Sequence, residues 1–210
     1  YYGCSAFTGC KNLKKIVIQE GMTKIPDEMF HRCAQIESIE IPDTVIEIGG
    51  SAFAECENLQ SVILPVSVTA IDTFAFDGCS QLTDVDLPSK LVKLDFGAFR
   101  NCTGITEITI PKTLKQVGYH GYYGCGAFTG CTNLKEVIFE KGITTITGEL
   151  LRNCDGLETI EIPDTVTEIE NSAFNGCVNL TSIKIPDTVN TIGTSVFSGC
   201  SALTELVLPK

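Results

Sequence analysis

Nine of the eleven cysteines recur at a fixed spacing, and this spacing constrains the fold more than any other feature of the sequence. The step is 23 residues within each of two series, and one longer step of 29 residues separates the series. The nine residues are Cys10, Cys33, Cys56, Cys79, Cys102, Cys131, Cys154, Cys177 and Cys200. Self-similarity at a period of roughly 20 to 50 residues is typical of a solenoid, in which one unit buries its apolar face only by stacking on its neighbours. We therefore expect a single solenoid of about nine coils over residues 1–210.

Each 23-residue unit contains a short segment that alternates apolar and polar residues and is predicted to be a β-strand. The nine segments are 14–18, 37–41, 60–64, 83–87, 106–110, 135–139, 158–162, 181–185 and 204–208. Proline follows the segment in seven of the nine units and stops the strand, because it has no N–H group for the ladder. At the usual spacing between paired strands, nine parallel strands make a sheet about 40 Å long.

Two further steps complete each unit. A short V-x-x-I step, such as Val45–Ile48, is expected to be extended. In the following A-F-x-x-C-x-x-L motif the spacing of three predicts one 3₁₀ or helical turn, with Ser51, Ser172 and Ser195 as candidate N-caps. The expected fold is thus an α/β repeat solenoid of right-handed coils, with a parallel β-sheet on one face and short extended and helical turns on the other.

The motif I-P-x-x-V-x-x-I-x-x-x-A-F-x-x-C-x-x-L, present at 41–59 and 162–180, resembles the BspA-type leucine-rich repeat. The resemblance covers essentially the whole chain. It implies a leucine-rich-repeat protein of the cell surface or a secreted one, with adhesion to host or extracellular-matrix proteins as its role. The family offers no catalytic residues to transfer to this sequence.

The repeated cysteines are predicted to form a reduced structural ladder. Each is flanked by an apolar residue three positions away on either side, the surroundings of a small buried apolar group. Stacked side chains point in parallel, whereas disulfides need converging Cβ atoms. Reactive or metal-binding roles for these thiols stay open as alternatives.

The longer step carries a tyrosine-rich insert at 118–126. Residues 122–131 repeat residues 1–10 with one difference, so a block of five coils recurs at an offset of 121. Tyrosine and glycine together are typical of binding loops, so Tyr119, His120, Tyr122 and Tyr123 are candidate ligand-binding residues. The alternatives are a loop whose tyrosines fold back over the neighbouring coil, a local disulfide of Cys125 with Cys131 or of Cys4 with Cys10, and a His120–Cys125 metal pair.

The strand positions that face away from the core carry a second candidate site. Asp84, Asp86, Glu107 and Glu136 fall on three successive strands and are expected to lie close together on the exposed face. They form either a solvated acidic face or a docking surface for a basic protein segment. A calcium site is the third alternative, but the sequence contains no acidic loop motif that would supply its ligands.

The net charge of −11 argues against binding of nucleic acid or anionic lipid, and no apolar run is long enough to cross a membrane. Neither histidine belongs to a catalytic or metal-binding motif, and no glycine-rich phosphate loop follows a strand, so neither an enzyme nor a cofactor is expected. The leading hypothesis is an extracellular protein-binding segment, and the alternative is a structural spacer that displays other domains. Because the sequence opens nine residues before the first repeated cysteine, we also expect a fragment of a longer array with weak end-to-end self-association.

Overall fold

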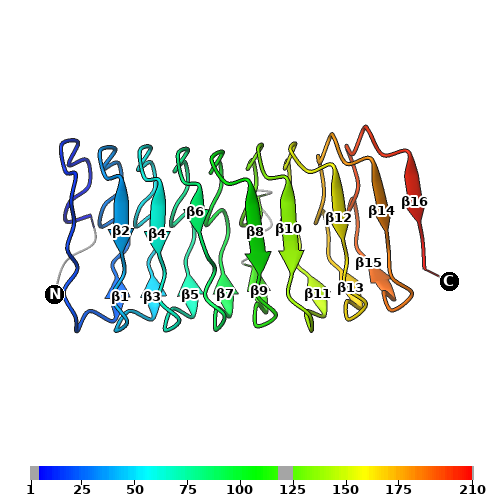
Figure 1. The fold of residues 1–210 in the computed structure, drawn as a ribbon, viewed down its shortest axis with the longest axis horizontal. Coiled ribbons are helices and arrows are strands. Elements are labelled where there is room, and N and C mark those ends of the chain that lie inside the picture. The colour runs from blue at the N-terminus through cyan, green and yellow to red at the C-terminus, as the bar shows by residue number, and fades with distance from the viewer. Residues whose placement is uncertain (1–4, 118–124, 210) are drawn as a thin grey trace.

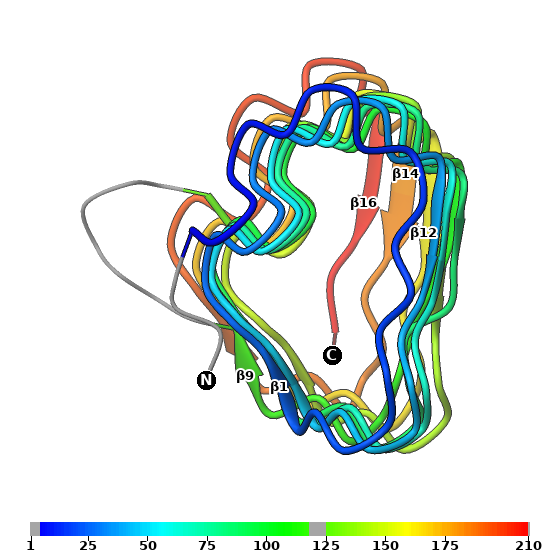
Figure 2. The same cartoon turned by 90° about the vertical axis from the view of Figure 1, so that its left-hand side faces the viewer.

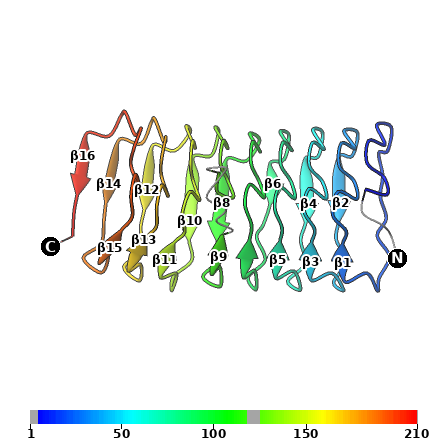
Figure 3. The ribbon, with the colours of Figure 1, turned by 180° about the vertical axis from the view of Figure 1, so that it is seen from behind.

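The computed structural model describes residues 5–117 and 125–209, which form one row of stacked coils (Figure 1). This described part contains sixteen short strands and no helix. Two strands fall in most coils, one on each side of the solenoid, and the row continues past the tyrosine-rich insert when it is seen from behind (Figure 3). The chain is therefore a parallel β-solenoid of leucine-rich-repeat type, and the helical part of the expected α/β class is wrong.

The first ribbon consists of eight strands at the predicted positions. They are β2 (Ser38–Glu40), β4 (Ser61–Ile63), β6 (Asp84–Val85), β8 (Glu107–Ile110), β10 (Glu136–Phe139), β12 (Thr159–Glu161), β14 (Ser182–Lys184) and β16 (Glu205–Val207). They pair in parallel within three groups, β2-β4-β6, β8-β10 and β12-β14-β16. Ser38 lies opposite Ser61, and Ser182 lies opposite Glu205, so paired residues 23 apart are neighbours in space. The ninth expected strand, at 14–18, is not formed, and a groove of about 640 Å³ is lined by these residues and by Glu37, Ser38 and Glu40.

The V-x-x-I step forms a second ribbon on the opposite side of the coils (Figure 2). Its strands are β1 (Lys24–Ile25), β3 (Glu47–Ile48), β5 (Ala70–Ile71), β7 (Lys93–Leu94), β9 (Gln116–Val117), β11 (Thr145–Ile146), β13 (Glu168–Ile169) and β15 (Thr191–Ile192). Parallel pairing links β1-β3-β5-β7-β9 and, separately, β11-β13-β15. The extended conformation predicted for this step is confirmed, and its hydrogen-bonded pairing is an additional finding.

The A-F-x-x-C-x-x-L segment is a series of tight turns. The N–H of Phe53 donates to the carbonyl of Ala75 in the next coil at 2.8 Å, whereas the N–H of Cys56 donates within its own coil to Phe53 at 3.2 Å. A helix would keep all of these bonds within one segment. Instead, two residues four apart in most series of turns adopt a left-handed backbone, such as the expected N-cap Ser51 at a φ of 53° and Glu55 at a φ of 58°.

The same correction applies to the other two expected caps. Ser172 and Ser195 also have positive φ, at 57° and 56°, whereas an N-cap residue has an extended backbone. The N–H of Ser172 donates to the carbonyl of Thr194 in the next coil at 2.9 Å. Bonding between coils therefore replaces helix capping at these serines.

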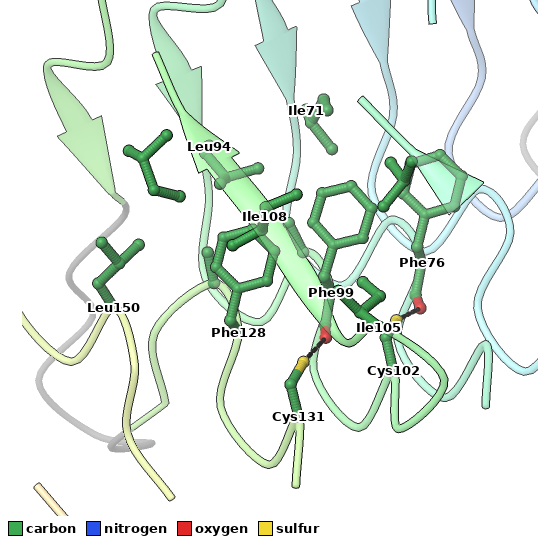
Figure 4. Close-up of a cluster of buried hydrophobic side chains, with 14 of the residues drawn as sticks. Ile71, Phe76, Leu94, Phe99, Cys102, Ile105, Ile108, Phe128, Cys131 and Leu150 are labelled. Atoms are coloured by element: carbon green, nitrogen blue, oxygen red, sulfur yellow. Dashed lines mark hydrogen bonds between the residues drawn. The ribbon is translucent and has the colours of Figure 1, made fainter. Parts of the chain in front are cut away.

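Stacked columns of identical side chains fill the interior (Figure 4). One column is a run of parallel phenylalanine rings with centroids 5.0–5.6 Å apart: Phe7, Phe30, Phe53, Phe76, Phe99 and Phe128. Leucine and isoleucine columns from both ribbons pack beside the rings. Because the two ribbons and the turns surround these columns, every interior coil depends on its neighbours for burial.

The predicted cysteine ladder is confirmed, with every cysteine of the described residues in the free form. Each thiol from Cys33 onward in the ladder donates to the carbonyl of the residue that begins the same turn in the preceding coil. For example, Cys102 Sγ lies 3.1 Å from the Phe76 oxygen, and Cys131 Sγ lies 3.1 Å from the Phe99 oxygen. The thiol thus joins adjacent coils by a weak hydrogen bond as well as by packing.

Burial makes the ladder thiols poor nucleophiles. Loss of hydration raises the pKa of Cys56, Cys131 and Cys177 to about 12, and it raises the pKa of Cys79, Cys102 and Cys154 in the same direction. The thiolate is the reactive species and the metal ligand. These thiols therefore serve as structural groups.

Candidate functional site

The acidic residues predicted as a site lie on or beside three successive strands of the first ribbon, of which β8 pairs with β10 and β6 pairs with β4. Asp84, Asp86, Glu107 and Glu136 are all exposed. Glu107 and Glu136 are directly opposite each other in the register of β8 and β10. Like charges opposite each other on paired strands repel, so this pair is mildly unfavourable in the chain alone.

Among the described residues, none of these four carboxylates takes part in an ion pair. The second ribbon is different over β1 to β7, where acids pair with lysines. Lys24 Nζ lies 2.6 Å from Glu47 Oε1, and Lys93 Nζ lies 2.6 Å from Asp72 Oδ1 and 3.0 Å from Asp95 Oδ2. The acids on or beside β3, β5 and β7 are therefore paired, whereas the four carboxylates on β6, β8 and β10 and at Asp86 are available to a basic group.

Apolar side chains flank the acidic residues on the same face. Ile63 on β4 is 62% exposed, and Ile138 on β10 is 49% exposed. Both occupy the outward column that also contains Asp86 and Thr109. A partner that pairs with the carboxylates would also cover these two side chains and remove apolar surface from water.

The tyrosine-rich insert is a separate feature. Tyr119, His120, Tyr122 and Tyr123 lie outside the described residues, as do Tyr1, Tyr2 and Cys4. The coils on either side of the insert remain in register, since the Phe99 and Phe128 rings stack at 5.4 Å and the Phe99 N–H donates to the Ala127 oxygen at 2.8 Å. Strand β9, which precedes the insert, lies across the solenoid from the first ribbon (Figure 2).

Cys125, at the end of the insert, is a free and buried thiol. The alternative of a disulfide between Cys125 and Cys131 is thus wrong for this structure. Burial raises the pKa of Cys125, and the nearby Arg100 guanidinium acts in the opposite direction. Within the described residues there is no group of three or more histidine, cysteine, aspartate or glutamate side chains that could hold a metal ion.

Two arginine pairs on the turn side were not predicted from the sequence. Arg100 donates to both carboxylate oxygens of Asp77, at 2.8 and 2.6 Å, and lies 4.5 Å above the Phe74 ring. Arg32 makes the same paired contact with Glu55, at 2.9 and 3.1 Å. Both pairs join residues 23 apart, so a search for opposite charges at the repeat distance would find them.

The protein-family model for the BspA type leucine rich repeat region matches the sequence over residues 2–127 and 124–210, with six copies. Among curated proteins, the chain has no match. No helix long and apolar enough for a membrane span occurs in residues 5–117 and 125–209.

Two solved bacterial structures are similar to this chain. A leucine rich cell surface protein from Faecalibacterium prausnitzii A2-165 is 26% identical, with 98% of this chain and 68% of that chain covered and a TM-score of 0.51. The leucine rich repeat protein of T. pallidum is 28% identical, with 80% and 78% covered and a TM-score of 0.59. Repeat motif, coil geometry and family match agree, and the chain belongs to the BspA-type leucine-rich repeat family.

Proposed function

We propose that this chain is a non-enzymatic protein-binding segment of a cell-surface or secreted protein, and that it binds a basic segment of a host-surface or extracellular-matrix protein. The observation that carries the proposal is the contrast between the two ribbons. The carboxylates of the first ribbon are exposed and free of ion pairs, whereas those on β3, β5 and β7 and beside them pair with Lys24 and Lys93. The printed name of the Faecalibacterium relative, a cell surface protein, supports the proposed location.

The proposed contact combines charge with a small apolar area. The four carboxylates would attract a lysine- or arginine-rich segment and orient it along the row of strands. Ile63 and Ile138 would then pack against the aliphatic parts of the same basic side chains. The tyrosine-rich insert is a second proposed contact.

Neutralising the four carboxylates of Asp84, Asp86, Glu107 and Glu136, which we call the acidic face, should weaken binding of the partner protein. We expect the variant Asp84→Asn, Asp86→Asn, Glu107→Gln, Glu136→Gln to bind an immobilised matrix protein about tenfold more weakly, a change of about 1.4 kcal/mol. Binding by the unchanged chain should also fall as salt is raised, because salt screens exposed charges. Surface plasmon resonance against single purified matrix proteins measures both effects.

A matched control changes the net charge equally but elsewhere. Glu20, Glu57, Glu158 and Asp164 are exposed acids outside the acidic face, and their amide variants should leave capture unchanged. Equal weakening by both variants would contradict the acidic face as the contact. Deleting residues 118–124 in the same assay tests the insert, which is refuted as a contact if affinity stays the same. If no matrix or host protein is captured by the unchanged chain, the structural-spacer alternative replaces the binding proposal.

A further inference from the structure

One junction between neighbouring coils differs from the others in the described part of the chain. Each coil from β1 onward carries a strand of the second ribbon, a turn with a ladder cysteine and a strand of the first ribbon. The coil of Cys131 carries β9 and β10, and the next coil, that of Cys154, carries β11 and β12. Among the described residues, β9 does not pair with β11, and β10 does not pair with β12. We call the contact between these two coils the 131/154 junction.

Every other pair of neighbouring coils between β1 and β16 keeps at least one hydrogen-bonded ladder. Between the coils of Cys79 and Cys102, for example, β6 and β8 are unpaired, but β5 pairs with β7. Directly after the 131/154 junction both ladders return, since β11 pairs with β13 and β12 pairs with β14. Within residues 5–117 and 125–209, the loss of pairing in both ribbons is therefore confined to this junction.

The column of stacked rings also stops at the 131/154 junction. The rings follow one another from Phe7 to Phe128, but the coil of Cys154 has Leu151 at the equivalent position. Stacking resumes only with Phe174 and Phe197, whose centroids lie 5.6 Å apart. Leu151 is fully buried, so the core stays packed, but no ring stacks on Phe128 from this side.

Buried polar atoms without a partner lie in the same two coils. Within the part of the chain that the structure describes, they are Thr129 Oγ1 and Thr147 Oγ1. Thr129 belongs to the turn of the Cys131 coil, and Thr147 directly follows β11 in the Cys154 coil. A buried hydroxyl without a hydrogen bond is unfavourable, and access of water would relieve it. Close packing is therefore less favourable here than at junctions whose buried polar atoms are paired.

The turns hold the two coils together. The N–H of Phe128 donates to the Leu150 carbonyl, and the N–H of Gly130 donates to the Arg152 carbonyl, both at 3.1 Å. The Cys154 thiol donates to the Phe128 carbonyl at 3.4 Å, the longest of the thiol contacts in the ladder.

Away from the turns, the junction is bridged by an exposed contact at the corner between the ribbons. There the Lys112 N–H donates to the Glu140 carboxylate at 3.1 Å. Water can replace an exposed side-chain acceptor of this kind at little cost. The turn side is therefore the firm connection, and the two ribbons are the sides that can separate.

We infer that the 131/154 junction is a hinge, at which the coils up to β10 and the coils from β11 onward bend relative to each other about the turns. Hydrogen-bonded ladders and stacked columns make each of the two groups of coils rigid, and the only step that lacks both ladders among the described residues lies between them. The acidic face lies entirely before the hinge, so bending changes the direction of the later coils and leaves the four carboxylates on one rigid unit.

Distances between spin labels test the hinge. The labels are attached to p-acetylphenylalanine, so the native thiols stay unmodified, and they are placed at equivalent exposed positions four coils apart. The pair at Thr83 and Thr181 spans the 131/154 junction, whereas the control pair at Glu37 and Lys135 does not. Both pairs span the interruption between β6 and β8, so they differ only in the hinge. We expect double electron–electron resonance to give a distance distribution about twice as wide for the first pair.

Leu151→Phe is a second variant, which restores a ring at the interrupted position. The equivalent residue of the first block is Phe30, which stacks on Phe7 and Phe53. We expect this change to narrow the distribution for Thr83 and Thr181 toward that of the control pair, with an unchanged circular dichroism spectrum. Equal widths for the two pairs in the otherwise unchanged chain, or a width that Leu151→Phe leaves as it was, would overturn the inference.

Discussion

Raising the pH to about 11 is expected to unfold the protein. In the folded chain the pKa values of Cys56, Cys131 and Cys177 are about 12, against an ordinary value of 9.0. Below pH 9 these thiols are neutral in both states, and their contribution to stability is complete. As the pH rises through the interval from 9.0 to about 12, the unfolded state ionises first, and the stability is lost.

The loss is large because several thiols act together. Each pKa unit corresponds to about 1.4 kcal/mol, so three thiols lose about 4 kcal/mol for each pH unit above 9, or about 8 kcal/mol by pH 11. The total stability of a typical domain is about 5–15 kcal/mol. Circular dichroism during a pH titration should therefore show loss of the β signal between about pH 10 and 11.

The triple variant Cys56→Ala, Cys131→Ala, Cys177→Ala isolates the thiol contribution. Its free energy of unfolding, measured with urea at several pH values, should fall about 4 kcal/mol less per pH unit than that of the unchanged chain. The comparison uses the slope, since removing the side chains also lowers stability at neutral pH. Identical slopes for the two chains would show that ionisation of other groups causes the alkaline transition.

Phe99→Ala is expected to be the most destabilising single change among the stacked rings. Phe99 is fully buried and stacks on Phe76 at 5.0 Å and on Phe128 at 5.4 Å. Removing a buried phenylalanine costs about 3–5 kcal/mol, and the loss of two stacked pairs places the expected value near the upper end. The position is also critical because the Phe99–Phe128 pair joins the coils on either side of the insert. Urea unfolding at pH 7 measures the change.

Phe7→Ala is the matched control for Phe99→Ala. Phe7 belongs to the same column, but it is 37% exposed and has one stacked neighbour among the described rings, Phe30. We expect a loss of about 1 kcal/mol or less, because the ring is already partly hydrated and its coil can relax around the change. Equal losses for the two variants would mean that the ring column does not couple the coils across the insert.

The columns of the fold follow directly from the sequence, because an identical step places identical residues at the same point of each coil. The burial of Cys102 and Phe99 and the exposure of Glu107 were all predictable from the 23-residue spacing and the alternation of the strands. The same spacing predicted the register in which Ser38 lies opposite Ser61.

The turns were not predictable in this way, because a spacing of three between apolar residues is compatible with a helix and with a series of tight turns. The choice depends on where the backbone N–H groups find acceptors. In a stacked solenoid a backbone carbonyl of the next coil lies within hydrogen-bonding distance, and the N–H of Phe53 donates to the carbonyl of Ala75. A single helical turn would leave such groups in adjacent coils without partners.

The residues of the candidate site were predictable, but the difference in ion pairing between them and the acids near β3, β5 and β7 was not. The sequence places Asp84, Asp86, Glu107 and Glu136 on one face, and the structure confirms their exposure. That Glu47, Asp72 and Asp95 pair with Lys24 and Lys93 depends on side-chain reach between coils, which the repeat pattern alone does not specify.

Thiol labelling followed by mass spectrometry tests the central claim, a single column of buried, reduced cysteines that links all the coils. The chain is treated with iodoacetamide at pH 8, first folded and then in urea, with no reductant in either sample. We predict that Cys56, Cys79, Cys102, Cys131, Cys154 and Cys177 remain unmodified in the folded chain and become fully modified in urea. Modification of these residues in the folded chain, or disulfide-linked peptides that resist modification in urea, would contradict the account.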